Sequence, residues 1–397
     1  MANAEYWLKW GDKCRHELTT NVMPFWMEHG LDRKNGGVYT CLDRDGALMD
    51  STKSVWFQGR FGWMTAHAYN HVEKRPEWLA ASKSCCEFLE AHCFAKNGRA
   101  YFEVTAEGVG LRRRRYVFSE CFAAIAYAEY ALASGDKAWA KKAVEMFRRI
   151  RKFMASPAKW MPSKYEPAVQ SKGHSLTMIL INVAMVLKQV SDDPVLDEQI
   201  TQSIDMLTKY FIHPEFKALL ETVGPNGEFI DTANGRVINP GHCIETSWFL
   251  MDVAVARGDD ELVKTALQIL DWSWNWGWDK KYGGIISFKD CRNFPPQWYE
   301  QDMKFWWPQC EAIIATAYAY RLTGKAKYMK WHEMASEWAW THLKDRKFPE
   351  WYGYLHRDGT VAQPAKGNIF KGPFHIPRML VKMWELSRDC ASVSVKG

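Results

Sequence analysis

Apolar residues recur at spacings of three and four along most of this 397-residue chain, which predicts helices of about 12–18 residues. The clearest predicted helices are Leu79–His92, Ser119–Ala133, Trp139–Met154, His174–Val190, Glu245–Arg257, Glu261–Asn275, Gln309–Leu322 and Lys327–His342. The first residues, MANAEYWLKWGDKCRHE, also have the mixed polar and apolar pattern of an amphipathic helix. The pattern therefore predicts a mainly helical protein.

Short glycine-containing segments, in which aromatic and β-branched residues alternate with polar ones, lie between these helices. They cover residues 35–46, 97–108, 226–235, 282–290 and 352–359. Such alternation beside glycine is typical of a strand or tight hairpin with a turn at one end. We therefore expect short hairpins among the helices.

The spacing of these segments indicates an internal repeat. Their first glycines are Gly36, Gly98, Gly227, Gly283 and Gly353, so the gaps are 62, 129, 56 and 70 residues. The gap of 129 residues is about two periods, and a degenerate member at 161–172 fills the missing place. Six units of about 60 residues, each with two helices and a hairpin, predict an all-α (α/α)6 barrel with short β-hairpins at one end. An open superhelix of helix pairs is the alternative.

The composition of the chain limits which molecules the protein could bind and in which cell compartment it could function. No apolar run is long enough for a membrane span, and no Pro- or Ser-rich linker divides the chain, so we expect one domain over residues 1–397. The N-terminus lacks a secretory signal and the ten cysteines are scattered without a CxxC motif, which predicts a cytoplasmic protein with reduced, mostly buried thiols. A net charge of +6 without a nucleic-acid-binding motif argues against nucleic acid as a partner. The run Arg112–Arg115 is either an anion site or a solvated loop face.

Aromatic residues are abundant, with 21 Trp, 16 Tyr and 20 Phe. Aromatic faces pack against the C–H faces of sugars, but they also fill large helical cores, so composition leaves both interpretations open. Arg60 stands among such residues in WFQGR (56–60). Burying an arginine there would require an anionic or polar partner.

Three predicted helix starts carry ionisable side chains. In NPGHCIE (239–245), an N-cap asparagine and a proline precede His242 and Glu245, which stand three apart on one face of the first turn. In WWPQCE (306–311), a proline again opens a helix with Glu311 in its first turn, and in GPFHIPR (372–378) His375 immediately precedes a helix that contains Arg378. In a barrel these starts would ring one pocket, where helix dipoles favour negative charge. The alternatives are a capping or surface role for each histidine and dipole compensation for each glutamate.

Several segments resemble the N-acylglucosamine 2-epimerase family, known in mammals also as renin-binding protein. The matching runs are GGVYTCLDRDG (36–46), VWFQGRFGWM (55–64), FSECF (118–122), NPGHCIETSWFL (239–250), MKFWWPQCEA (303–312), EWYGYLHRDG (350–359) and FKGPFHIPR (370–378), with a shorter run at PFWMEHG (24–30). The resemblance extends through nearly the whole chain. It implies an (α/α)6 barrel, in agreement with the repeat count.

The resemblance also implies roles for single residues. The family's two catalytic histidines correspond to His242 and His375, its substrate-contacting arginines to Arg60 and Arg378, and its pocket carboxylates to Glu245 and Glu311. Relatives that act on cellobiose or free aldoses carry a further functional histidine; His174 is near that place, although SKGHSLTM does not match their His-rich motif. Family members are typically homodimers, and many are activated by ATP without consuming it. The chain has no P-loop, so Arg112–Arg115 is one candidate for a nucleotide site.

The implied reaction interconverts N-acetyl-D-glucosamine and N-acetyl-D-mannosamine. The C2 proton is acidic only in the ring-opened aldehyde, so one imidazole would remove it and the other would return a proton to the opposite face. Arg60 and Arg378 would stabilise the charge at O1, while Glu245 or Glu311 would orient an imidazole or bind hydroxyls. This chemistry requires neither a cofactor nor a metal, and the chain has no HExxH motif or Cys/His ligand set.

Other functions remain open at this point. A cellobiose 2-epimerase or an aldose–ketose isomerase would use the same histidines on another sugar. A glycoside hydrolase would need two acids, for which Glu245 and Glu311 are candidates, but the histidines would then have no part. A non-catalytic protein-binding module would leave the polar pocket without a role. The sequence does not decide which histidine serves which face of the sugar.

Overall fold

The computed structural model describes residues 2–163 and 170–396. Twelve long helices in these residues alternate along the chain between an outer and an inner ring. The inner helices are α3 (Val55–His71), α5 (Phe118–Ser134), α8 (His174–Leu187), α10 (Pro240–Arg257), α12 (Trp306–Thr323) and α14 (His375–Lys396). The outer helices are α1 (Ala2–Glu17), α4 (Pro76–His92), α6 (Lys137–Ala155), α9 (Pro194–Met206), α11 (Asp260–Gly277) and α13 (Ala326–His342).

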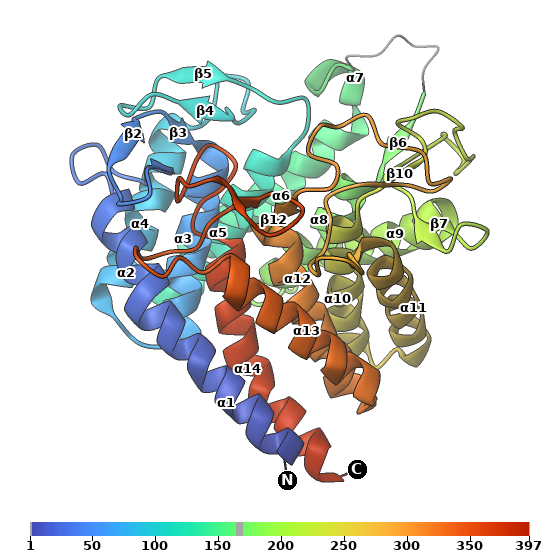
Figure 1. Ribbon diagram of the computed structural model, residues 1–397. Helices are drawn as coiled ribbons and strands as arrows, with labels where there is room; N and C mark the ends of the chain where they lie inside the picture. The colour runs from blue at the N-terminus through green and yellow to red at the C-terminus, as the bar shows by residue number, and fades with distance from the viewer. Residues whose placement is uncertain (1, 164–169, 397) are drawn as a thin grey trace.

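The inner ring closes on itself. Each inner helix packs on the next, and α14 packs on α3. Each outer helix from α4 to α13 packs on the inner helix that precedes it in the chain, whereas α1 lies along α14, so the first and last helices are side by side (Figure 1). This closure confirms the predicted (α/α)6 barrel. It excludes the open superhelix, in which the first and last helix pairs would lie far apart.

Inner and outer helices differ in how they distribute apolar residues. Residues 119–131 of α5 and 308–320 of α12 are buried without interruption, because these helices face both the barrel interior and the outer ring. Outer helix α6 instead buries positions three or four apart, which are Ala143, Met146, Phe147, Ile150 and Phe153. The amphipathic pattern that indicates a helix in sequence therefore belongs mainly to the outer ring.

A glycine allows two inner helices to approach closely. A Cβ atom at Gly59 of α3 would lie 2.5 Å from the carbonyl carbon and oxygen of Phe122 in α5. That separation is well inside van der Waals contact, so a side chain at position 59 would push the two helices apart.

Short antiparallel strands connect the helices. They are β1 (Cys41–Leu42), β2 (Leu48–Asp50), β3 (Lys53–Ser54), β4 (Glu103–Val104), β5 (Gly110–Arg112), β6 (Lys172–Gly173), β7 (Ile212–His213), β8 (Ala218–Leu219), β9 (Thr222–Val223), β10 (Val237–Ile238), β11 (Lys289–Asp290), β12 (Lys304–Phe305), β13 (Tyr354–Leu355) and β14 (Val361–Gln363). They form the sheets β1–β2, β3–β4–β5, β6–β9, β7–β8, β10–β11 and β12–β13–β14. Most of them gather at one end of the barrel (Figure 1). Because β3, β6, β10 and β12 lead directly into α3, α8, α10 and α12, the small sheets hold the starts of these inner helices.

The predicted elements are present with shifted boundaries. All eight predicted helices form, but α10 begins at Pro240 rather than Glu245 and α12 at Trp306 rather than Gln309. Of the predicted hairpins, 226–235 is a series of turns between β9 and β10, and 282–290 contributes only β11. Both segments differ from a hairpin because β10 and β11 pair with each other across the long α10–α11 helix pair. Half of the predicted repeat member at 161–172, residues 164–169, lies outside the described residues.

The remaining helical segments are short. They are α2 (Met23–Phe25), α7 (Pro157–Trp160) and the wider turns η1 (Leu18–Val22), η2 (Trp26–Gly30) and η3 (Leu207–Phe211). Among the described helices, none has the length and apolar character needed to cross a membrane. The ten cysteines are free and nine are buried, which confirms the prediction of buried thiols.

Candidate active site

A cavity of about 360 Å³ lies among the starts of the inner helices. Side chains from all six inner helices line it. The aromatic ones are Trp56, Phe118, Phe122, Phe305, Trp306, Trp307, Tyr354, Phe370 and Phe374, and the ionisable ones other than tyrosine are Arg60, His242, Glu245, Glu300, His375 and Arg378. A cavity of this size with apolar walls and a few convergent polar groups is typical of a small-molecule site. Five of the seven residues that the sequence analysis singled out therefore line one cavity.

His242 lies in the first turn of α10. The Asn239 side-chain oxygen accepts a hydrogen bond from the backbone N–H of His242 at 3.2 Å and so caps the helix. The imidazole Nδ1 is 3.0 Å from a carboxylate oxygen of Glu221 and 3.1 Å from the side-chain nitrogen of Asn239. The carboxylate favours the tautomer with hydrogen on Nδ1, which leaves Nε2 for a ligand. Burial lowers the pKa of His242, but the Glu221 carboxylate outweighs burial and the pKa is raised above its ordinary value.

His174 lies behind His242. The Glu221 carboxylate that faces His242 is also 3.6 Å from Nδ1 of His174. The imidazole of His174 is fully buried at the start of α8, and its Nε2 is 2.8 Å from the Thr246 hydroxyl. The rings of His174 and His242 are 6.3 Å apart, and His174 is not among the residues that line the cavity.

Sequence reasoning missed Glu221, which lies between β8 and β9. The only signal was a lone carboxylate in the apolar run ALLETVG (218–224). No spacing rule links it to His174 or His242, which precede and follow it on different helices. Burial raises the pKa of Glu221, but His242 and His174 outweigh it and hold that pKa well below its ordinary range.

His375 is held by a second carboxylate. It is the first residue of α14, whereas the sequence analysis placed it immediately before the helix. Its Nδ1 is 2.8 Å from Glu311, which is fully buried and also accepts a hydrogen bond from the Trp248 indole at 2.9 Å. This contact favours the tautomer with hydrogen on Nδ1 and a free lone pair on Nε2. Burial and the neighbouring Arg378 lower the pKa of His375 well below its ordinary value, so the ring is neutral.

Arg378 joins the two predicted carboxylates. Its Nη2 donates to Glu245 and to Glu311, at 2.6 Å in both cases. A buried guanidinium requires such partners because desolvation of the unpaired charge is costly. Glu245 lines the cavity, whereas Glu311 lies behind His375 and is not among the lining residues.

Arg60 lies among aromatic rings, as its sequence context suggested. Its guanidinium carbon is 4.1 Å from the ring centre of Phe122 and 4.7 Å from that of Phe374. Burial and the charge of Arg378 lower the pKa of Arg60 to about 9, which leaves it protonated at neutral pH.

Several N–H groups of the cavity lining are unpaired. The buried donors that have no hydrogen-bond partner within the described residues include Nε of Arg60 and Arg378 and Nε1 of Trp56 and Trp306. Buried donors are nearly always paired with protein, water or ligand. These groups therefore indicate a ligand rich in oxygen acceptors.

Trp307 contacts both cavity histidines. Its ring centre is 5.1 Å from that of His242 and 5.9 Å from that of His375. A Cβ atom at Gly241 would overlap the Trp307 indole, so the glycine that precedes His242 makes room for this ring. The two imidazoles and the indole thus form one continuous part of the cavity wall.

Two histidine and glutamate groups near the cavity are compact enough to hold a metal ion. Among the described residues they are His174 with Glu221 and His242, and Glu245 with Glu311 and His375. In the second group the Arg378 guanidinium already bonds both carboxylates, so a divalent ion would meet a buried cation. In the first group, a metal on Nδ1 of His242 would displace the hydrogen bond to Glu221. That the chemistry needs no metal stays a prediction.

The basic run Arg112–Arg115 lies at the end of β5 and in the loop after it. Arg112 forms an ion pair with Glu103 at 2.6 Å. The Arg114 guanidinium carbon is 4.3 Å from the ring centre of Phe102 and 5.6 Å from that of Phe370, which lines the cavity. The run is therefore close to the cavity rim, and its role as a nucleotide site stays a prediction.

Comparison with known proteins identifies the family. A family model described as N-acylglucosamine 2-epimerase matches residues 37–373. The N-acylglucosamine 2-epimerase of Bos taurus is 33% identical over 390 residues, which cover 96% of this chain and 92% of the relative, and that of Rattus norvegicus is 33% identical with coverage of 94% and 90%. A solved cellobiose 2-epimerase from Bacillus thermoamylovorans superposes with a TM-score of 0.83 at 21% identity, covering 95% of this chain and 99% of the other, which supports the fold. The chain belongs to the N-acylglucosamine 2-epimerase family.

Proposed function

We propose that this protein is an isomerase that interconverts N-acetyl-D-glucosamine and N-acetyl-D-mannosamine. The observation that carries the proposal is that two imidazoles, His242 and His375, line one cavity, each with Nδ1 held by a carboxylate and Nε2 left for the substrate. The mammalian relatives with this named activity support the choice of an N-acylated hexosamine.

The reaction begins with the ring-opened sugar, whose C1 aldehyde makes the C2 proton acidic. One imidazole removes this proton and leaves an enediolate, and the other returns a proton to the opposite face of C2. Negative charge develops at O1 and requires fixed positive partners. Arg60 and Arg378 serve this purpose, since each carries a buried Nε–H that no described protein group accepts.

The two imidazoles have opposite protonation preferences. Burial and Arg378 keep His375 neutral, whereas Glu221 favours the imidazolium form of His242 against the effect of burial. Environments that push two pKa values apart are typical of an acid–base pair. In the resting protein His375 is therefore the base and His242 the acid. After proton transfer the two charge states are exchanged, which is the state from which the reverse reaction starts.

The other predicted site residues have supporting roles in this proposal. Glu245 lines the cavity and binds sugar hydroxyls. Glu311 orients His375 and holds its tautomer, which is one of the two roles that the sequence left open. His174 was proposed as a substrate contact, but its position behind Glu221 and Thr246 supports a role in orienting the first of these groups rather than direct contact.

An assay of purified protein tests the proposal. It measures conversion of N-acetylglucosamine to N-acetylmannosamine and back, in ordinary and in deuterated water. Deuterium must appear at C2 with turnover, and His242→Asn and His375→Asn should each lower kcat by about 10²–10⁴-fold, since each removes an acid–base group. Near-normal activity in both variants would exclude the two-base mechanism.

Substrate comparison tests the alternative functions. Glucose, mannose and cellobiose should turn over much more slowly than the N-acetyl sugars; a preference for a neutral sugar would instead support the cellobiose 2-epimerase or aldose–ketose isomerase alternative. A glycoside hydrolase is disfavoured because Glu311 already accepts from His375, Arg378 and Trp248 and has no free oxygen for a glycosidic bond. Absence of turnover on every sugar would favour the protein-binding alternative.

Assembly, location and regulation are further parts of the proposal. We propose one domain over residues 1–397 and a homodimer, both supported by the family resemblance. We also propose a cytoplasmic location, which the ten free thiols support. We also propose ATP as an activator that is not consumed, with Arg112–Arg115 as its candidate site. Sedimentation velocity tests the dimer. Activity with and without ATP, in the parent and in an Arg113→Gln and Arg115→Gln double variant, tests the activation.

A further inference from the structure

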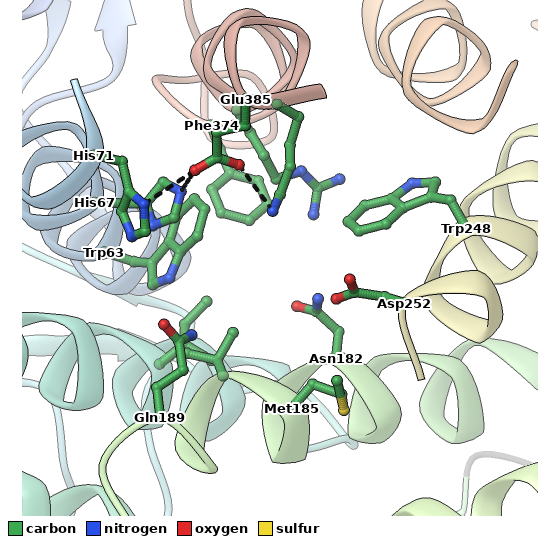
Figure 2. A pocket seen from close by; sticks show the side chains of 14 residues that line it. Trp63, His67, His71, Asn182, Met185, Gln189, Trp248, Asp252, Phe374 and Glu385 are labelled. Atoms are coloured by element: carbon green, nitrogen blue, oxygen red, sulfur yellow. Dashed lines mark ion pairs between the residues drawn. The ribbon is translucent and has the colours of Figure 1, made fainter. Parts of the chain in front are cut away.

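A second cavity, of about 280 Å³, lies on the other side of Phe374 and Arg378, which line both cavities. Figure 2 shows its side chains, with His67 and His71 from α3 below Glu385 of α14. These three residues have no part in the proposed reaction. Their arrangement requires a separate explanation.

The donor atoms suit a transition metal. His67 and His71 are one helical turn apart, with ring centres 4.1 Å from each other. Oε1 of Glu129, from α5, lies 3.1 Å from Nδ1 of His67 and 3.8 Å from Nε2 of His71, and the three ligand atoms are within 4.8 Å of one another. Bonds of about 2.1 Å to a tetrahedral Zn²⁺ put neighbouring ligand atoms about 3.4 Å apart, which lies between the two observed distances.

Unpaired polar atoms at the same place indicate a missing partner. Both ring nitrogens of His67 and Oε2 of Glu129 are buried without a hydrogen-bond partner in the described residues, and these side chains are only 6% and 0% exposed. Nδ1 of His67 is at ion-pair distance, 3.1 Å, from Oε1 of Glu129, which also accepts a hydrogen bond from the Asn70 amide at 2.9 Å. An orphaned buried group costs about 1–3 kcal/mol, so a bound group is expected here. A metal ion bound to the lone pair on Nδ1 of His67 and to the Glu129 carboxylate would give both side chains a partner. The imidazole N–H would then be on Nε2, which faces Glu385.

Glu385 occupies the position of an outer carboxylate. Its Oε1 is 3.1 Å from Nδ1 of His71 and 3.6 Å from Nε2 of His67, which are the ring nitrogens that face away from Glu129. Histidines that bind metals commonly donate their other N–H to such a carboxylate, which orients the ring. The second oxygen of Glu385 pairs with Lys382 at 3.2 Å, so it is not free for an ion.

We propose that His67, His71 and Glu129 bind a divalent transition-metal ion of the Zn²⁺ class, with Glu385 orienting the two imidazoles. The ligands come from α3 and α5, and Glu385 from α14. Because α3 and α14 make the contact that closes the inner ring, the ion would stabilise the packing of α3, α5 and α14 at that contact. It would also stabilise α14, which begins with His375.

Metal titration of the full chain tests this site. Chelator-treated protein is titrated with Co²⁺, followed by visible absorption, and with Zn²⁺, followed by calorimetry and thermal unfolding. We expect one ion per chain at this site and a higher unfolding temperature with Zn²⁺. His71→Asn and Glu129→Gln should each weaken binding at least tenfold, and Glu385→Gln by about 10–100-fold. His16→Asn changes an exposed histidine on α1 and should bind like the parent.

A further variant separates this site from the cavity histidines. Glu221→Gln alters only the group of His174 and His242 and should retain the ion. An ion that is lost from Glu221→Gln but kept by His71→Asn would overturn the proposal. A parent chain that binds neither metal would overturn it as well. These measurements report metal binding alone, so their outcome is independent of the sugar assay.

Discussion

Replacing Glu311 by glutamine keeps the size of the side chain and removes its charge. In the parent, Glu311 accepts hydrogen bonds from His375, Arg378 and Trp248 and is fully buried. A glutamine has one acceptor oxygen and one NH2 group, so at least one of these donors must face another donor. The substitution therefore replaces the charged acceptor of the His375 Nδ1–H by a neutral amide, and if the amide oxygen faces Trp248 instead, its NH2 group faces Nδ1 and favours the other tautomer.

The cost can be estimated from these contacts. Loss of one hydrogen bond to a charged group costs about 1.5–3 kcal/mol, and loss of an entire buried ion pair about 3–5 kcal/mol. Because Glu245 still pairs with Arg378, we expect the free energy of unfolding to fall by about 2–3 kcal/mol. At about 2.1 cal/mol/K per residue, a chain of 397 residues should then unfold about 3 °C lower. By analogy with the carboxylate of a Ser-His-Asp triad, kcat should fall by about 10²–10⁴-fold.

Glu245→Gln is the matched control. It removes an equivalent 2.6 Å contact to Arg378, whereas the carboxylate that lies 2.8 Å from His375 Nδ1 is that of Glu311. Thermal unfolding should report similar losses for both variants. In steady-state kinetics Glu311→Gln should lower kcat, whereas Glu245→Gln removes a group that binds sugar hydroxyls and should mainly raise KM. If a folded Glu311→Gln protein kept kcat within about threefold of the parent, the orienting role of Glu311 would be wrong.

Three further predictions test the electrostatics and the packing. Glu221→Gln removes the carboxylate that raises the pKa of His242, so the alkaline limb of the pH profile of kcat/KM should move to lower pH; an unchanged limb would contradict the assignment of His242 as the acid. Burial lowers the pKa of His332 to about 3, so the neutral ring stabilises the fold fully above pH 6.5 and progressively less as the pH falls toward 3. At pH 5 the free energy of unfolding should be lower by about 2 kcal/mol on this account. The drop in unfolding temperature from pH 8 to pH 5 should therefore be smaller in His332→Gln, and an equal drop would refute the linkage. Gly59→Ala should destabilise the barrel by about 1–3 kcal/mol or more, because its Cβ would overlap the Phe122 backbone. Gly173→Ala is the control, since a Cβ there meets nothing within 4 Å, and it should unfold near the parent temperature. Equal unfolding temperatures for the two variants would show that α3 and α5 can separate.

The helix starts show how far sequence reasoning reached. Asn239 and Pro240 are local signals, and they correctly placed His242 at the start of a helix. Local signals were weaker at α12 and α14, because Trp306 and His375 begin their helices two residues before a proline. A proline is tolerated there since the first N–H groups of a helix have no partner within it.

The sequence by itself determined the repeat count, the closed helical architecture expected from it, the family and most of the cavity residues. Each of these depends on local periodicity, on capping residues or on motifs that the chain carries in short runs. Only the tertiary structure decided that Glu221 serves His242, that Glu311 lies behind His375, and that His174 is outside the cavity lining. It also brought His67 and Glu129 together. The physical reason is that hydrogen bonds and charges act between neighbours in space, and a closed ring makes neighbours of residues that are far apart in the chain.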